Sequence, residues 1–289
     1  MLRPLRESDS EAVVACYRSA YGDERQIDAE TIVGWCRNPE FKPDWMQVLE
    51  LDDEVVGYGD IWIGDEEAEL DLAAPGHWET FLDWGESRGR SAGVARMRAT
   101  FPVPHELQQV VAARGYRFWR SAYTMQIEFD EAPPEAPVLP NEIELRGYEP
   151  ADAEALRATL NEAFARDPFF HRVTPKSFDA FYLGTRGFDP SLWLLAWADG
   201  ELAACLLAYP EFGGDTGLGS IQSLGVRPLW RRRGLASALL RTAFRELHTR
   251  GLRRVRLGVD AENETGAVRL YERVGMQVVR RQDNWVLEL

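Results

Sequence analysis

The chain has 289 residues, of which 45% are hydrophobic and 28% charged, and its formal net charge is −14. This composition is ordinary for a globular protein with a sizeable core, and it excludes disordered, collagen-like and disulfide-framework classes. Three cysteines without CxxC spacing indicate no cysteine zinc site either. The sequence shows no apolar signal core or membrane-spanning stretch, so it predicts a cytoplasmic protein.

The charge is unevenly distributed along the chain. Residues 1–130 carry 25 acidic and 13 basic side chains, whereas residues 131–289 carry 22 and 20. Residues 227–256 alone contain ten arginines and one acid, Glu246. This basic stretch indicates a local anionic partner such as a phosphorylated small molecule, and the alternative is a solvated helix face. Nucleic acid is disfavoured as a partner because the acidic remainder of the chain would repel it.

The first half opens with a short strand near Arg3 and an amphipathic helix. Two apolar runs, 46–51 and 55–63, flank the acidic turn 52–54 and predict a β-hairpin. Residues 114–129 then predict a glycine turn followed by two strand segments. The stretch 130–141 contains four prolines and predicts an extended linker. We therefore expect domains at 1–130 and 142–289, joined by a linker at 131–141.

The second half repeats this order. Runs 192–198 and 202–209 predict a hairpin, followed by a strand at 220–226 and a helix at 234–249. A strand with alternating apolar residues follows near Val255. A second helix carries apolar residues from Ala267 to Val274, with Gly275 as its C-terminal cap. These elements predict an α/β fold with a mixed sheet of the α+β kind flanked by helices.

The two halves resemble each other closely enough to indicate an internal duplication. Residues 114–129 align with 274–289 at an offset of 160. Near the start of each half, Arg3 before Asp9 corresponds to Arg146 before Asp152 at an offset of 143. We infer two copies of one unit, of which the second is about 17 residues longer.

The loop 226–236 has features that are typical of an anion-binding site. It joins a predicted strand to a helix N-terminus, where unpaired backbone amides and the positive end of the helix dipole favour phosphate. Gly234 and Ala236 leave the backbone accessible, and arginines supply charge. The spacing matches neither a Walker loop nor a GxGxxG turn. A basic turn without a ligand is the alternative.

Two motifs then resemble those of the GCN5-related N-acetyltransferases. Motif A of that family, Arg/Gln-x-x-Gly-x-Gly/Ala, is filled by Arg231, Gly234 and Ala236 after a strand that ends in Leu224-Gly225-Val226. Motif B is similar to the stretch 263–276, with its Asn, Ala, Leu-Tyr and Gly-Met in order. The resemblance implies two tandem acyl-CoA N-acyltransferase domains of this type, the second being catalytic.

The resemblance also implies the donor and how it binds. Acetyl-CoA would place its pyrophosphate on the backbone amides of Arg231, Arg232, Arg233, Gly234, Leu235 and Ala236. Its pantetheine arm would pair with Leu224 and Val226, and Arg232 and Arg233 would meet the adenosine phosphates. Asn263 would contact the donor, cap its own helix, or do both. Tyr271 would protonate the departing thiolate, since an ordinary tyrosine is protonated at neutral pH.

The base that deprotonates the amine is less clearly marked. Many relatives carry a glutamate six residues before the position of Val226, and this sequence has Ser220 there. Deprotonation then runs through water held by Ser220 or Gln222, through bulk solvent, or through one of three side chains: Glu211, Asp215 or His171. No metal-site or nucleophile-elbow motif occurs, so we expect neither metal nor covalent catalysis.

The first copy departs from both motifs. Val111 and Val103 stand where Tyr271 and Asn263 would align, and the short stretch 73–77 replaces the arginine loop. This copy is predicted to be degenerate for CoA. Its acidic stretch 65–71 would attract a cationic amine or form a solvated edge. Tandem copies with an active second one resemble the layout of the mycothiol synthases within the family.

We therefore expect an acetyl-CoA-dependent N-acetyltransferase that acetylates a primary amine of a small molecule by direct attack. A peptide or protein amine is an alternative acceptor. From another class, the fold would serve as an acyl-CoA sensor without turnover, which the missing strand glutamate favours. No nucleic-acid, membrane or metal partner is expected.

Overall fold

A computed structural model describes residues 1–22, 25, 27–132 and 134–289. The chain forms two compact units, one of residues Met1–Tyr123 with Arg280–Leu289 and the other of Thr124–Val279. This division differs from the predicted ranges in two respects. It falls inside a strand rather than in the linker, and residues 280–289 belong to the first unit.

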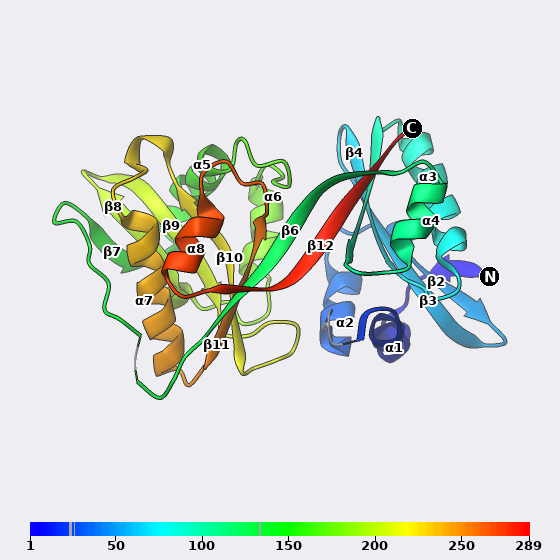
Figure 1. The fold of residues 1–289 in the computed structure, drawn as a ribbon, viewed down its shortest axis with the longest axis horizontal. Coiled ribbons are helices and arrows are strands. Elements are labelled where there is room, and N and C mark those ends of the chain that lie inside the picture. The colour runs from blue at the N-terminus through cyan, green and yellow to red at the C-terminus, as the bar shows by residue number, and fades with distance from the viewer. Residues whose placement is uncertain (23–24, 26, 133) are drawn as a thin grey trace. The chain divides into compact units, whose positions relative to one another are not determined.

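The first unit combines strands with helices that pack on its sheet (Figure 1). In chain order its elements are β1 (Leu2–Pro4), α1 (Ser10–Tyr21), α2 (Ala29–Arg37), β2 (Met46–Leu51), β3 (Glu54–Ile63), β4 (Glu67–Ala73), α3 (Trp78–Ala92), β5 (Arg96–Pro102), α4 (Leu107–Ala113) and the start of β6 (Arg117–Glu128). The predicted hairpin is present as β2 and β3, which pair antiparallel.

The second unit has the same order of elements. They are β7 (Glu144–Gly147), α5 (Ala153–Ala163), α6 (Pro175–Phe178), β8 (Trp193–Ala198), β9 (Glu201–Tyr209), β10 (Leu218–Val226), α7 (Leu235–Thr249), β11 (Arg254–Asp260), α8 (Ala267–Arg273) and the start of β12 (Gln277–Glu288). The predicted mixed α/β fold is confirmed, and Gly275 follows α8 with a φ of +96° that suits a helix end.

The same local device opens both units and confirms the alignment of their starts. The Arg3 guanidinium donates to both carboxylate oxygens of Asp9, at 2.7 and 3.0 Å. Arg146 does the same with Asp152, at 2.7 Å to each oxygen. In both units the aspartate also accepts a backbone N–H three residues before it. Each pair joins the first strand of its unit to the first helix.

Each unit completes its sheet with a strand segment from the other repeat. In the first unit the order is β1-β2-β3-β4-β5-β12, and residues 282–288 of β12 pair antiparallel with 96–102 of β5. In the second the order is β6-β11-β10-β9-β8-β7, and the end of β6 adjoins β11. Strands β6 and β12 therefore exchange places between the repeats.

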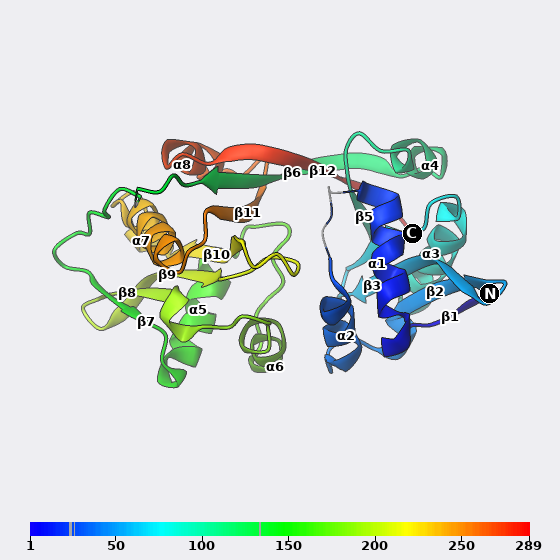
Figure 2. The ribbon, with the colours of Figure 1, turned by 90° about the horizontal axis from the view of Figure 1, so that it is seen from below.

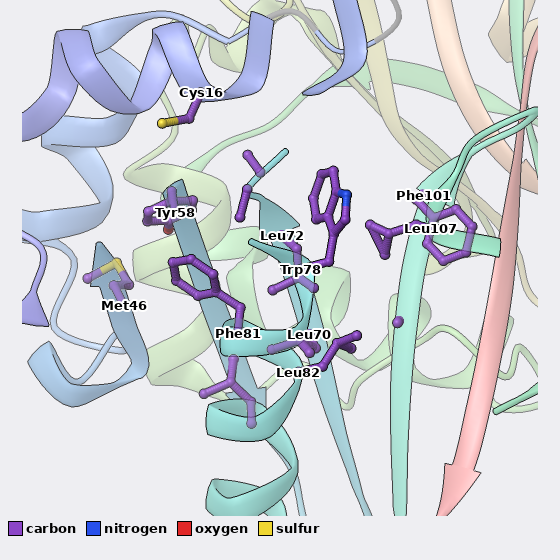
Figure 3. Packing of buried hydrophobic residues seen from close by; sticks show 14 of the residues in the cluster. Cys16, Met46, Tyr58, Leu70, Leu72, Trp78, Phe81, Leu82, Phe101 and Leu107 are labelled. Atoms are coloured by element: carbon purple, nitrogen blue, oxygen red, sulfur yellow. The ribbon is translucent and has the colours of Figure 1, made fainter. Parts of the chain in front are cut away.

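The core of the first unit lies between its sheet and its helices. Along β3 the side chains alternate, so that Tyr58 faces α1 while Gly57 and Gly59 face Phe81 on α3. Figure 3 shows Phe81 and its neighbours pointing from α3 onto the sheet. The second unit has its own core, in which Trp193 is fully buried.

In the second unit, α5 and α6 cover one face of the sheet and α7 covers the other (Figure 2). The end of α5 crosses β10 so closely that a methyl group at Gly225 would stand 3.1 Å from Ala163 Cβ. This crossing places the loop after α5 next to the end of β10. Within the described ranges, no helix is long and apolar enough to cross a membrane.

Candidate functional site

Strand β10 loses one neighbour halfway along its length. It pairs with β9 as far as Val226, whereas its parallel pairing with β11 covers only Leu218–Ile221. A register shift between Ile221 and Ser223 leaves Gln222 as a bulge at this point. Beyond the bulge, β10 and β11 diverge, and the edge of β10 facing β11 has no strand partner among the residues that the structure describes.

Alternation along the strand shows which peptide groups face this gap. The Arg227 N–H donates to Ala203 O on β9 at 3.0 Å, so Arg227 and Gly225 face β9. Leu224 and Val226 consequently face the gap. The Val226 carbonyl accepts Arg231 Nε at 3.0 Å, which leaves the Leu224 peptide groups and the Val226 N–H for an extended ligand.

The loop after β10 presents backbone amides at the start of α7. Its first helical hydrogen bond runs from Ala238 N to Gly234 O at 3.0 Å. For the amides of residues 232–237 no acceptor is found among the described parts of the chain. Gly234 has a φ of +84°, and a methyl group there would meet no atom within 4 Å. The loop therefore forms an open cradle of donors that suits a phosphate.

Arg231 holds the cradle in place through its side chain. Its Nη2 donates to Ala163 O at 2.9 Å, in addition to the bond from Nε to the strand end. The guanidinium thus ties β10 to the end of α5. The structure gives this motif residue an internal role, so its contribution to a ligand comes through the loop conformation.

Most of the other arginines in the basic stretch 227–256 are also engaged within the second unit. Eight of the ten donate to carboxylates, an amide or backbone carbonyls; these are Arg227, Arg231, Arg241, Arg245, Arg250, Arg253, Arg254 and Arg256. Arg241 and Arg245 bind the linker, at Glu135 and at Pro134 O. The stretch is therefore largely an internal scaffold rather than one anion-binding face.

Arg232 and Arg233 are the exceptions. Both are exposed, and neither has an acidic or carbonyl partner in the parts of the chain that the structure describes. Arg233 lies over the Trp230 ring, with 4.7 Å from its guanidinium carbon to the ring centroid. The charge that remains open to a ligand therefore lies beside the amide cradle.

Tyr271 lies on α8 and is 7% exposed. Its hydroxyl has no hydrogen-bond partner among the described residues. Burial raises its pKa well above the ordinary value, and the negative charge of Asp167, in the loop after α5, adds to the effect. The hydroxyl consequently stays protonated at neutral pH and is available to donate.

Asn263 caps the turn before α8. Its Oδ1 accepts the backbone N–H of Thr265 at 2.9 Å and, more weakly, that of Ala267 at 3.4 Å. The N-cap position of α8 is Gly266 and has no side-chain cap, so Asn263 stabilises the preceding turn and reaches the helix only through its weak bond to Ala267.

The candidate bases on the acceptor side are already occupied. Ser220 Oγ donates to Glu211 O at 3.1 Å, and Gln222 Nε2 donates to Phe181 O at 3.3 Å. The carboxylate of Glu211 is paired with Arg186, and that of Asp215 with Arg254 at 2.9 Å. His171 is exposed.

Two further polar groups lie near the gap and were not assigned a role from the sequence. Burial raises the pKa of Tyr182, and a hydrogen bond with Ser223 on β10 partly offsets the effect. Tyr182 sits in a π-helical segment, Asp179–Leu183, a conformation that often marks functional sites. The sequence contains no pattern that predicts the π-helical segment. The second group is Asp167, which the sequence places in the loop after α5, but the sequence does not indicate that it lies close to Tyr271.

In the first unit the equivalent strands also separate, but a side chain of the unit itself fills the gap between them. Its β4–β5 pairing also stops early, at Leu70, and Glu69 occupies the position of Ser220 in the sheet. Only four residues, 74–77, connect β4 to α3, against eight between β10 and α7. The Leu72 carbonyl, equivalent to that of Leu224, is taken by the Tyr21 hydroxyl. The first unit thus fills its gap with its own side chain.

Among the described residues, no group of three or more His, Cys, Asp or Glu side chains is arranged to hold a metal ion.

Comparison with known proteins agrees with this geometry. The sequence profile of the acetyltransferase (GNAT) family matches residues 157–276. A mycothiol acetyltransferase of Cellulomonas flavigena is 31% identical over 80% of this chain and 70% of its own length. One from Streptomyces scabiei is 30% identical over 79% and 75%.

Solved structures extend the likeness to the whole chain. A GCN5-related N-acetyltransferase from Sphaerobacter thermophilus has a TM-score of 0.80 at 29% identity, covering 100% of this chain and 95% of that one. A tandem GNAT protein from the clavulanic acid biosynthesis pathway, 16% identical, covers 100% and 98% with a TM-score of 0.72 and shares the fold. The chain belongs to the GCN5-related N-acetyltransferase family, with two tandem domains, and is an acetyltransferase that uses acetyl-CoA.

Proposed function

We propose that the chain transfers an acetyl group from acetyl-CoA to a primary amine of a small molecule, with the chemistry in residues 142–279 of the second unit. The observation that carries the proposal is the combination, in one unit, of an open strand edge, an amide cradle and a buried tyrosine hydroxyl, and neither the cradle nor the hydroxyl has a hydrogen-bond acceptor among the described residues. The first unit has closed its gap and has Val111 at the position of Tyr271.

The residues present fit the donor. The Leu224 N–H and carbonyl and the Val226 N–H suit the amides of the pantetheine arm, which would add to β10 like a strand, whereas the Val226 carbonyl is taken by Arg231. The amides of residues 232–236 suit the pyrophosphate, and Gly234 leaves room for its close approach. Acetyl-CoA supplies the activated acetyl group as a thioester.

Proton movements follow from the environment of Tyr271. As the acceptor nitrogen bonds to the acetyl carbon, the carbon–sulfur bond breaks and the sulfur needs one proton. The buried Tyr271 hydroxyl is protonated and has no competing acceptor in the described part of the chain, so it is the proposed donor.

The acceptor ammonium must lose a proton before it attacks. Because Glu211 and Asp215 are each held in an ion pair, we propose that this proton leaves through water or bulk solvent near Ser220 and Gln222. A turnover rate that tracks the pKa of the acceptor amine across a series of amines would support this route. A rate set by a fixed enzyme pKa, lost in Glu211→Gln, would contradict it.

The relatives are named for mycothiol, and we do not transfer that acceptor to this chain. Acceptor specificity resides in loops, and this chain has Ser220 where many family members carry a strand glutamate. The acceptor proposed for this chain is therefore a small primary amine.

The test measures release of free CoA thiol from acetyl-CoA across a panel of small amines. We expect turnover with some amine, and Tyr271→Phe should lower kcat by about 10²-fold or more while leaving acetyl-CoA affinity unchanged. Tyr116→Phe is the matched control, because it also removes a buried hydroxyl without a partner, in the first unit. Acetyl-CoA binding without thiol release for any small amine or peptide would instead identify a sensor.

A further inference from the structure

The π-helical segment Asp179–Leu183 is held against the sheet beside the bulge in β10. Gln222 Nε2 donates to Phe181 O at 3.3 Å, and the Tyr209 hydroxyl donates to Tyr182 O at 3.1 Å. One of these contacts comes from β10 and the other from β9. They fix the backbone of the segment relative to both strands, so its side chains have a defined place beside the bulge.

The side chain of Tyr182 is fixed at both its ring and its hydroxyl. The ring stacks on Phe178, with 5.4 Å between the centroids, and lies edge-on to Trp193 at 6.4 Å. The hydroxyl forms a hydrogen bond with Ser223 on β10. Ser223 is 8% exposed, whereas Tyr182 is partly exposed. Because a phenol oxygen can take part in more than one hydrogen bond, the oriented hydroxyl can also bind a ligand.

The direction of the donor determines where its acetyl group lies. The proposed donor is anchored at its diphosphate by the amides before α7, which follow the C-terminal end of β10. Its pantetheine arm would run back along the strand edge from Val226 to Leu224. The thioester at the far end of the arm would then lie beside Ser223, next to the bulge at Gln222. The Tyr182 hydroxyl is therefore close to the reacting group.

The two faces of the sheet differ at this point. One face is covered by α7, whose N-terminus anchors the donor, and the other by α5 and α6, which the π-helical segment continues (Figure 2). Alternation puts Ser223 on the same face as Gly225, where a methyl group would stand 3.1 Å from Ala163 Cβ. An acceptor that approaches the thioester from the face opposite α7 would thus pass the Tyr182 hydroxyl.

We infer that Tyr182, with its hydroxyl oriented by Ser223, contacts the acceptor and accepts a hydrogen bond from the nitrogen that attacks the thioester. Tyr182 is then a substrate-binding residue, and Ser223 is a positioning residue that acts through it. A neutral primary amine can donate one N–H to the phenol oxygen while its lone pair points at the acetyl carbon. This inference rests on the proposed function, because the donor in the gap is what places the thioester beside Ser223.

The experiment measures steady-state kinetics of the full chain with acetyl-CoA and a small primary amine. The probe is the amine with the fastest turnover in a panel that includes ethanolamine, tyramine and glucosamine. Tyr182→Phe should raise the KM for this amine about 5- to 10-fold, which corresponds to one hydrogen bond, and should change kcat by less than about twofold. The Kd of acetyl-CoA, measured by calorimetry, should not change.

A second substitution separates a positioning role from a structural one. Ser223→Ala should raise the same KM by a smaller factor, about two- to fourfold, and it carries the test if Tyr182→Phe melts at a much lower temperature than the wild type. Because Ser223 acts through the Tyr182 hydroxyl, the variant with both substitutions should have the KM of Tyr182→Phe alone. Effects that multiply in the double variant would overturn the positioning role.

Tyr148→Phe is the matched control. Tyr148 belongs to the same ring cluster, with 5.1 Å between its centroid and that of Trp193, and it is 7% exposed. Its hydroxyl makes no hydrogen bond to β10 in the described ranges of the chain. The KM for the amine should therefore stay at the wild-type value in this variant.

The remaining outcomes distinguish this inference from the proposed function. If Tyr182→Phe leaves the KM for the amine unchanged, the inference is wrong, and a fall in kcat alone would mean that the hydroxyl contacts the thioester in the transition state instead. Weaker binding of acetyl-CoA would make Tyr182 a donor contact and would also overturn the inference. In all three cases the wild type still acetylates the amine. Absence of turnover with every amine of the panel would instead overturn the proposed function.

Discussion

Single residues show how one ion pair fixes the start of each unit. The Arg146 guanidinium holds the pKa of the Asp152 carboxyl below its usual range, chiefly by hydrogen bonding, and Asp152 is 5% exposed. A depressed folded-state pKa contributes stability above the unfolded pKa of about 3.9, and this contribution is lost as the pH falls through the folded-state value. The pair therefore stabilises the second unit at neutral pH and fails in acid.

Asp152→Asn should accordingly lower the free energy of unfolding at pH 7 by about 1.5–3 kcal/mol. The difference from wild type should shrink as the pH is lowered from 6 to 3, because the wild-type carboxylate becomes protonated. Urea unfolding at several pH values measures it. Asp9→Asn, the equivalent change in the first unit, should shift stability in the same direction, since Asp9 is also buried and hydrogen-bonded to an arginine, although Arg3 keeps Glu50 as a second partner. A difference that stays constant with pH would refute the electrostatic origin.

For single residues, the sequence predicts which residues belong to the site better than it predicts what each side chain contacts. The motifs predicted the arginine loop, Asn263 and Tyr271. They did not predict that the Arg231 side chain binds two backbone carbonyls, because a sequence carries no pattern for which carbonyl a fold leaves unpaired. They singled out Arg232 and Arg233 as arginines open to a ligand, and both are exposed, but they did not predict that the other eight arginines of residues 227–256 are engaged within the unit.

Elements were predictable where one periodicity dominated. Both hairpins, the helix at 234–249 and the strand near Val255 lie within a few residues of their predicted bounds. The bulge at Gln222 and the end of the β10–β11 pairing at Ile221 were not predicted. Neither feature has a signature in the sequence of β10, because both concern which neighbouring strand a residue pairs with rather than a periodicity within the strand.

The packing of β3 against α3 makes a direct prediction about close approach. A methyl group at Gly59 would stand 2.5 Å from Phe81 Cδ1 and 3.0 Å from Leu72 Cδ2. We expect Gly59→Ala to destabilise the first unit by about 1–3 kcal/mol through overpacking. Chemical denaturation measures the loss.

Gly34 provides the matched control for this substitution. It lies inside α2, and a methyl group there would meet no atom within 4 Å. Gly34→Ala should therefore stabilise by up to about 1 kcal/mol, because alanine is the better helix former. A Gly59→Ala variant as stable as the wild type would contradict the close contact with Phe81.

On the scale of the whole molecule, the exchange of β6 and β12 separates chain order from unit membership. The offset of 160 between residues 114–129 and 274–289 correctly identified equivalent strands. It could not show that β6 ends in the second unit and β12 in the first. Pairing of each strand within its own repeat and pairing with the other repeat would produce the same alternation of side chains along the strand. Which strand pairs with which is determined by tertiary structure and not by the pattern within one strand.

Removing residues 280–289 should therefore damage the first unit, although it deletes residues distant from it in sequence. It removes the strand paired with β5 and the buried Asn284, whose Oδ1 accepts Thr100 Oγ1 at 2.7 Å and whose Nδ2 donates to Arg120 O. We expect hydrogen exchange to lose protection across β3–β5. Val278→Ser, at a 45% exposed position earlier in β12, is the control and should change stability by less than about 0.5 kcal/mol. Unchanged protection in the truncated chain would refute the exchange.

The exchange also sets an order of events during synthesis. A ribosome makes the first repeat, the linker and nearly all of the second before residues 282–288 emerge, so the sheet of the first unit waits with the edge of β5 uncovered for more than half of the chain's translation. An uncovered strand edge attracts other strands, and this interval is when a nascent chain would need protection. It also means that a gene cut at the proline-rich linker would encode two incomplete proteins rather than two domains.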